Sequence, residues 1–156
     1  GGRLPLKAYE DLKAFKIYFL DIGLLRVMCE IDPGIILDSV AVFKEFMGAL
    51  TEQFVLQELQ TAEIAANIYY WSEGATSEVD FIFSYHNRII PVEAKAGLVV
   101  HAQSLKQFCR KYEPETAIRT SLKEYHRDGH LLNLPLYQMW NLKQILEDDR
   151  EAASDL

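Results

Sequence analysis

Apolar and polar positions along the first half of the chain predict a lead-in followed by one long helix. Residues 3–16 mix apolar and charged side chains, as a helix or an extended lead-in does. Lys16–Leu20 predicts a short strand, and Asp21 is the expected cap of a short helix that follows it. Asp32-Pro33-Gly34 predicts a turn. Over residues 43–65 apolar side chains recur at helical spacing, so the longest helix is expected there.

The second half alternates between strand and helix patterns. We expect strands at Asn67–Trp71, Ser77–Phe83, Ile89–Gly97, Thr116–Ser121 and Leu132–Tyr137, and helices at Gln103–Lys111 and Leu142–Arg150. Pro135 places the last strand at a sheet edge, because proline cannot donate to a ladder. Residues 126–130 predict a loop, and the acidic end from 147 to 156 is expected to fray.

This order of elements predicts an α/β fold with a mixed central β-sheet flanked by helices. The main elements run helix, three strands, helix, strand (α-β-β-β-α-β). We divide the chain into an N-terminal lead-in (1–42), a core (43–145) and an acidic C-terminal end (146–156). The chain opens Gly-Gly-Arg without a methionine, which is expected of a fragment of a longer protein.

The central hairpin carries charges where apolar side chains dominate both faces. Glu78 and Asp80 lie on its first strand and share a face, as Glu93 and Lys95 do on its second. The residues between them are almost all apolar, so both faces should be covered and the charges partly buried. Buried charge is costly and needs a compensating role. The competing interpretation is a structural ion pair on an exposed hairpin.

Two acids and a lysine at one point suit the hydrolysis of a phosphodiester. Mg²⁺ binds one or two carboxylates and keeps several waters, and Asp80 and Glu93 are the expected ligands, with the Ala94 carbonyl as a further one. Mn²⁺ is the alternative ion. Lys95 would orient a water or offset charge in the transition state. Glu52 on the long helix, near inward apolar positions, is the expected additional acid.

Composition narrows the possible partners. The 156-residue chain has a formal net charge of −7, which argues against a non-specific nucleic-acid coat. Residues 98–131 are the exception, with six Lys or Arg against four acids, and are the expected polyanion-binding stretch. Tyr69, Tyr70 and Trp71 would stack on bases or belong to the core. Cys29 and Cys109 are isolated, as reduced core thiols are, and no membrane span is visible, so a cytoplasmic location is expected.

Several motifs together resemble a known family. Tyr18-Phe19-Leu20-Asp21-Ile22-Gly23-Leu24, 48–55, Tyr70-Trp71, Glu78-Val79-Asp80-Phe81 and Val92-Glu93-Ala94-Lys95-Ala96-Gly97 span roughly residues 15–122. The acid followed by Glu-x-Lys resembles the PD-(D/E)XK, restriction-endonuclease-like nuclease core. The whole set resembles the C-terminal domain of unknown function found on bacterial and archaeal AAA+ ATPases.

The resemblance implies a role for each matching residue. Glu52 would be the acid of the first core helix, Asp80 and Glu93 the metal ligands, and Lys95 the catalytic lysine. Val79 stands where the motif's name has proline. The implied function is a Mg²⁺-dependent nuclease, or a DNA-binding relic of one, attached to an upstream ATPase domain. The rival is a non-catalytic module that binds a partner or mediates assembly of the ATPase.

Overall fold

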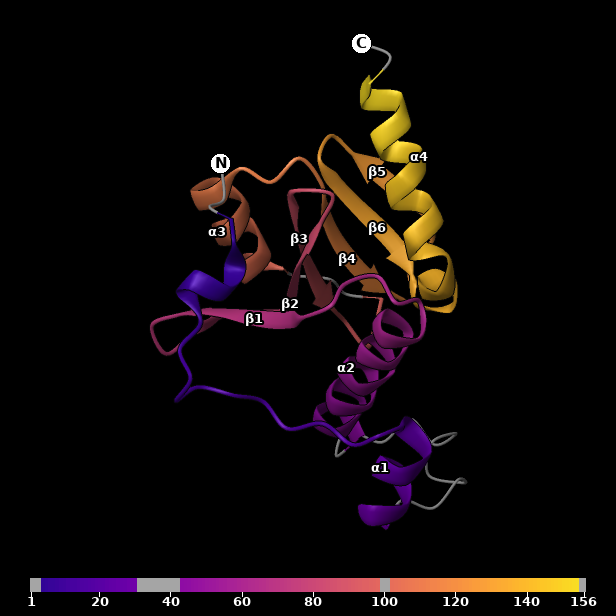
Figure 1. Cartoon of the computed structure of the whole chain (residues 1–156). Coiled ribbons are helices and arrows are strands. Elements are labelled where there is room, and N and C mark those ends of the chain that lie inside the picture. The colour runs from indigo at the N-terminus through magenta and orange to yellow at the C-terminus, as the bar shows by residue number, and fades with distance from the viewer. Residues whose placement is uncertain (1–3, 31–42, 99–101, 155–156) are drawn as a thin grey trace.

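The computed structural model describes residues 4–30, 43–98 and 102–154. Within these ranges one sheet of six strands has the order β1-β2-β3-β4-β6-β5 (Figure 1). The strands are β1 (Ile68–Glu73), β2 (Ser77–Tyr85), β3 (Arg88–Ala94), β4 (Ala117–Ser121), β5 (His126–Asp128) and β6 (Leu131–Pro135). The helical elements are η1 (Leu6–Tyr9), α1 (Ile22–Met28), α2 (Phe43–Thr61), α3 (Gln103–Tyr112), η2 (Leu136–Asn141) and α4 (Leu142–Ser154).

The sheet is mixed, as the sequence predicts. The strands β1, β2 and β3 pair antiparallel, β4 lies parallel to both β3 and β6, and β5 returns antiparallel on β6. The turn between β2 and β3 has two central residues, His86 and Asn87, which both adopt positive φ, 45° and 62°. A two-residue turn of this kind matches the twist of the flanking strands.

Helices cover both faces of the sheet, so the prediction of an α/β fold flanked by helices is confirmed. One face packs against α2 and α4, whose fully buried residues are Val55, Leu59, Leu142 and Leu146. The other face packs against α3, through Leu105 and Phe108. The strands β2 and β3 contribute to both clusters, which explains why apolar residues dominate both sides of the hairpin.

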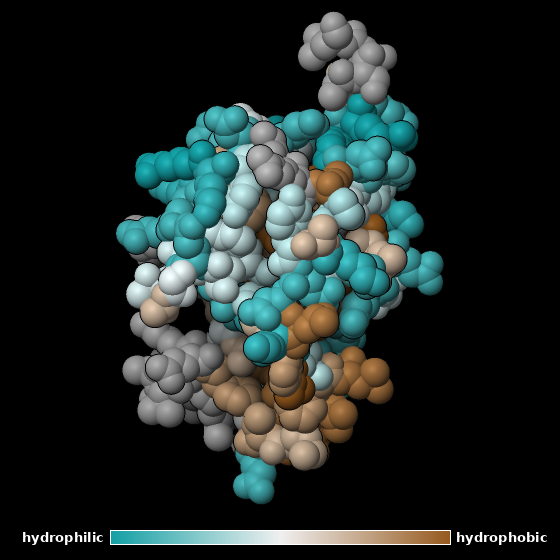
Figure 2. Space-filling view, turned by 60° about the vertical axis from the view of Figure 1, so that its left-hand side comes forward, coloured by the Kyte–Doolittle hydropathy of each residue, from teal (hydrophilic) through white to brown (hydrophobic). Residues whose placement is uncertain are grey.

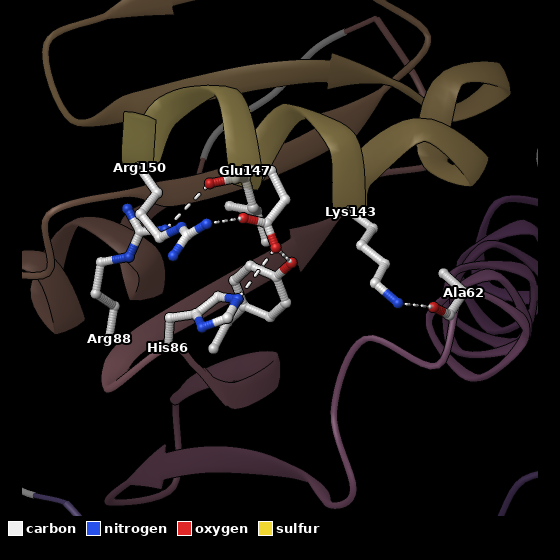
Figure 3. Close-up of polar contacts among 8 residues, drawn as sticks. Ala62, His86, Arg88, Lys143, Glu147 and Arg150 are labelled. Carbon is white, nitrogen blue, oxygen red and sulfur yellow. Dashed lines mark hydrogen bonds and ion pairs between the residues drawn. The ribbon is translucent and has the colours of Figure 1, made fainter. Parts of the chain in front are cut away.

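The helix α4 is fixed to the hairpin by polar contacts around Glu147 (Figure 3). The Tyr85 hydroxyl donates to Glu147 Oε1, and His86 Nε2 lies 3.0 Å from the same oxygen. Arg150 pairs with the other oxygen at 2.9 Å. Arg88 donates to the Leu146 carbonyl at 3.1 Å. These contacts hold α4 across the β2–β3 turn, far from the opposite end of the hairpin where the charged residues lie.

The N-terminal lead-in is attached to α2 by a buried glutamine. Gln53 is 2% exposed; its side chain accepts from the Phe19 N–H and donates to the Phe19 carbonyl, both at 2.9 Å. This pair mimics one rung of a β-ladder. The segment is extended but lies outside the sheet, so the strand predicted at Lys16–Leu20 is wrong. Asp21 caps α1 as predicted, accepting from Leu24 N–H at 2.8 Å.

Over residues 16–20 the lead-in turns polar side chains inward and apolar ones outward. Ile17 and Leu20 are each 84% exposed, whereas Lys16 and Tyr18, on either side of Ile17, are partly buried. Figure 2 shows apolar side chains gathered at the end of the molecule where Figure 1 places α1. The inversion follows from what the segment covers, because the surface beneath it is the group of carboxylates described below.

Three further expectations are wrong. His126–Asp128 is the strand β5 and not a loop. It covers β6, so Pro135 ends a strand inside the sheet rather than at its edge. The acidic end does not fray from 147, because α4 continues to Ser154. The predicted turn at Asp32-Pro33-Gly34 lies outside the described residues.

Both cysteines are free thiols. Cys109 is half-buried, and burial raises its pKa to about 11. Cys29 is exposed, so the expectation of a core thiol is wrong there. In the ranges that the structure describes, no helix combines the length and the apolar character that crossing a membrane requires.

Replacing Gln53 with leucine should loosen the lead-in. The substitution keeps the buried volume but leaves the Phe19 N–H and carbonyl without their partner, so we expect a loss of about 1–2 kcal/mol in the free energy of unfolding. Urea unfolding measures this loss, and amide exchange at Phe19 should accelerate at least tenfold. Gln144→Leu, on the exposed side of α4, is the matched control. Equal stability and equal exchange in both variants would contradict the attachment through Gln53.

Candidate functional site

A β-bulge positions the first acid of the hairpin. The register between β1 and β2 shifts between Tyr69 and Trp71, so that Asp80 and Phe81 together stand opposite Tyr70. Such a bulge adds a residue to one strand, bends it and redirects its side chains. Here it restores the inward direction for Phe81, which packs in the core on the α2 side. Asp80 is thereby brought into a buried position, 8% exposed.

The strands β2 and β3 separate just beyond this bulge. Their register ends at Phe81 and Val92, after which β3 continues beside β4 alone. The Ala94 N–H, which would otherwise face an absent strand, donates to Asp80 Oδ2 at 2.7 Å. The carboxylate therefore takes the place of a backbone carbonyl. The fork thus leaves the start of β2 and the end of β3 unpaired with each other.

Glu93 lies on β3 next to this fork and is almost fully buried. Its Oε1 pairs with Lys95 Nζ at 2.6 Å, while its Oε2 is buried and has no hydrogen-bond partner. Burial raises the pKa of Glu93 despite the nearby ammonium of Lys95. An unpartnered buried carboxylate oxygen is costly and rare in native proteins. It marks this position as one that a donor or a cation would stabilise.

Asp80 is held in an environment that favours its neutral form. Burial, together with the negative charges of Glu93 and Glu52, raises its pKa to about 7. The hydrogen bond from Ala94 and the charge of Lys16 act in the opposite direction. Perturbed acids of this kind gather at functional sites. The structure thus brings Asp80, Glu93 and Glu52 within electrostatic reach of one another.

Glu52 on α2 faces the same group through residues of the lead-in. Its Oε2 accepts from the Tyr18 hydroxyl at 3.2 Å and lies 3.5 Å from Lys16 Nζ. Lys16 also pairs with Glu78 Oε1 at 2.5 Å. Although burial opposes its charged form, these partners raise the pKa of Lys16. Lys16 therefore links an acid on α2 to an acid on β2.

The sequence pattern did not indicate Lys16 and Tyr18 as members of this site. The signal that could have found them is their spacing, since residues two apart in an extended segment share a side. The apolar neighbours Ile17 and Phe19 obscured it, because apolar residues are expected to face inward.

The described residues offer at most two neighbouring carboxylates, not three, at the fork. Among the residues described, no three His, Cys, Asp or Glu side chains are grouped so that they could hold a metal ion. Asp80 and Glu93 remain available from adjacent strands, and Glu52 engages the lead-in. Two carboxylates with water completing the shell suit Mg²⁺, which dehydrates reluctantly.

Comparison with known proteins places the chain in a family without assigning it a role. No curated protein matches the chain. A family model described as a domain of unknown function (DUF4143) matches residues 47–138, which is more than half of the sequence. The matched range begins in α2, includes the forked hairpin and ends within η2. The chain therefore belongs to this family, the domain of unknown function DUF4143.

Proposed function

We propose that this chain is a Mg²⁺-dependent phosphodiesterase domain with a restriction-endonuclease-like core, acting on DNA as part of an AAA+ ATPase. The observation that carries the proposal is the buried acid pair at the β2–β3 fork, where Glu93 Oε2 has no hydrogen-bond partner. The resemblance of Asp80, Glu93 and Lys95 to the PD-(D/E)XK motif supports it.

The residues at the fork fit a hard divalent cation. Asp80 and Glu93 supply two carboxylates in a setting where burial, together with their mutual repulsion, raises the pKa of Asp80. The Ala94 carbonyl adds a neutral oxygen donor. These groups would hold Mg²⁺, or Mn²⁺ in its place. When bound, the ion supplies charge neutralisation at the phosphate and lowers the pKa of a coordinated water.

Lys95 is suited to donate hydrogen bonds rather than to accept a proton. Burial disfavours its charge, but the hydrogen bond to Glu93 and the charges of Glu93, Asp80 and Glu52 raise its pKa. It is therefore an ammonium at neutral pH, and it can orient a water molecule or offset negative charge on a phosphate oxygen. Glu52 has an indirect role in this proposal, because it holds Tyr18 and Lys16 beside the other acids.

The alternative function is a non-catalytic interaction or DNA-binding module of the ATPase. The observation that favours it is the pairing already present at the site, Lys95 with Glu93 at 2.6 Å and Lys16 with Glu78 at 2.5 Å. Such pairs make the acids partners of lysines rather than of a cation. The net charge of −7 also favours a module, or a substrate bound through a metal and a local basic rim.

Asp80→Asn should fold and should remove a pH-dependent penalty. The pKa of Asp80 is about 7 in the folded protein against 3.8 for a free side chain, so its contribution favours folding below about pH 4 and is lost as the pH rises through 7. Asparagine stays neutral and can still accept from Ala94. Between pH 4 and 8 the variant should gain on the order of 2–4 kcal/mol relative to wild type.

Urea unfolding at pH 4, 6 and 8 measures this gain. Asp128→Asn, at an exposed position of β5, should behave as wild type. A variant that fails to fold, or that is less stable at every pH, would show that the Asp80 carboxylate is structural and would remove the basis of the site.

Calorimetric titration with Mg²⁺ and Mn²⁺ tests the metal site directly. Binding requires the carboxylates to be deprotonated, so affinity should be roughly tenfold higher at pH 8 than at pH 6, with release of about one proton at pH 6. Asp80→Ala should abolish binding, and Asp128→Ala should preserve it. Absence of binding to the wild-type chain at either pH would favour the interaction module.

Replacing Lys95 with methionine separates metal binding from catalysis. Methionine removes the ammonium while leaving Asp80 and Glu93 in place, so Mg²⁺ should still bind while cleavage of plasmid and oligonucleotide DNA falls by about 10²-fold or more. Lys106→Met on the exposed side of α3 is the control. The assay uses the chain alone and the chain joined to its ATPase. A Lys95→Met variant that cleaves as fast as wild type would exclude the proposed role of Lys95.

A further inference from the structure

A large cavity lies beside the acid group, between the lead-in and β1. It has a volume of about 1090 Å³, and its lining runs from Leu6 in the lead-in across β1 to Tyr112 in α3. Asp80 and Lys16 line it as well, so the cavity reaches the candidate site at Asp80. Pockets that take small molecules reach about this size.

Aromatic side chains form part of the walls of this cavity. Tyr69, Tyr70, Trp71 and Tyr112 all line it, and each is only partly buried. Three of them back onto the α3 core cluster, which explains how a β-rich aromatic run can belong to the core on one side. Tyr70 alternates with Tyr69 and Trp71 along β1, so its ring lies on the opposite face of the strand, toward Lys16. Tyr69 and Trp71 therefore belong partly to the core, as one interpretation of this run predicts, whereas stacking on bases stays a prediction.

The rings of Trp71 and Tyr112 are held in place by contacts with each other and with Phe108. Trp71 Nε1 donates to the Tyr112 hydroxyl at 3.3 Å, and the two rings meet edge to face with centroids 6.2 Å apart. Trp71 also meets Phe108 edge to face at 5.4 Å. Rings fixed in advance lose little conformational entropy when a ligand stacks on them.

Lys16 lies between the Tyr70 ring and the acids. Its ammonium lies 5.4 Å from the centre of the Tyr70 ring while it pairs with Glu78. A ligand that reaches from the acids into the cavity would thus meet a cation first and flat aromatic surfaces next. A phosphate attached to a heteroaromatic ring has this sequence of properties.

Because the chain is negatively charged overall, contacts with bases should contribute more to nucleic-acid binding than attraction to the phosphate backbone. A chain with a net charge of −7 gains little from long-range attraction to a phosphate backbone. Stacking of bases on aromatic side chains contributes about 1–3 kcal/mol per base and needs no net positive charge. In a duplex the base faces are covered by their neighbours, so only an unpaired or extruded base can stack in this way.

We propose that the cavity bounded by the lead-in, β1 and α3 binds an unpaired nucleobase of the DNA strand whose phosphodiester lies at the fork. The position of the phosphodiester rests on the proposed function, whereas stacking of the base does not require the metal. The lead-in then forms one wall of a binding site, besides supplying Lys16 to the acids.

Trp71 fluorescence tests this proposal. The chain has two tryptophans, and Trp140 is 68% exposed in η2, so a Trp140→Phe chain reports on Trp71 alone. An eight-nucleotide thymidine strand, titrated in EDTA, should quench Trp71 saturably. A strand of equal length and charge built from abasic units should bind at least tenfold more weakly. Equal binding of the two strands would overturn the proposal without requiring any variant of the cavity.

A matched pair of tyrosine variants tests whether base-dependent binding takes place in the cavity. Tyr70→Leu keeps an apolar side chain but removes the ring, and it should weaken thymidine binding about tenfold while leaving abasic binding unchanged. Tyr137→Leu, 71% exposed and outside the cavity, should bind as the parent does. Equal effects of both would overturn the proposal.

The outcomes also separate this proposal from the nuclease. Base-dependent quenching without metal binding would leave a nucleobase site and remove the phosphodiesterase. Metal binding and cleavage without base-dependent quenching would do the opposite.

Discussion

The structure depends on the hydrogen bond that Asp80 accepts from the Ala94 N–H at the point where β2 and β3 part. A sheet that forks leaves backbone groups without partners, and an orphaned buried N–H is about as costly as a lost hydrogen bond. A carboxylate at the bulge satisfies this group and lets the strands separate without that penalty. The cost is transferred to the carboxylate, which is buried next to Glu93, so its pKa rises to about 7. The same residue thus makes the fork possible and stores electrostatic strain within it.

The lead-in supplies a positive charge, that of Lys16, close to these acids. Its extended backbone is fixed to α2 by Gln53, and this attachment sets Lys16 and Tyr18 against acids on α2 and β2. The arrangement exposes apolar side chains such as Ile17, which a segment selected only for packing would bury. Lys16 pairs here with two partly exposed acids, Glu52 and Glu78, and its charge opposes the raised pKa of Asp80.

Sequence patterns predicted the parts of the fold that depend on local periodicity. The long helix, the hairpin and the mixed sheet follow from spacing and turn chemistry, and the charges within apolar strands pointed to Asp80, Glu93 and Lys95. The parts missed depend on distant partners. The strand β5 is three exposed residues long and is defined only by pairing with β6, and Lys16 belongs to the site only because Gln53 holds its segment. The β-bulge could not be predicted either, because the alternation of apolar and polar residues does not show which residue of a strand has no partner on the neighbouring strand.

Charge arithmetic connects the site to its candidate ligands. Four carboxylates, Glu52, Glu78, Asp80 and Glu93, interact here with two ammonium groups, Lys16 and Lys95, so full ionisation leaves two negative charges. Protonation of Asp80 removes one of these two negative charges, which is consistent with the raised pKa of Asp80. One divalent cation would remove all of it and would also supply a partner for Glu93 Oε2. A single monovalent partner could not do both, and this charge balance supports the divalent ion that we propose at the fork.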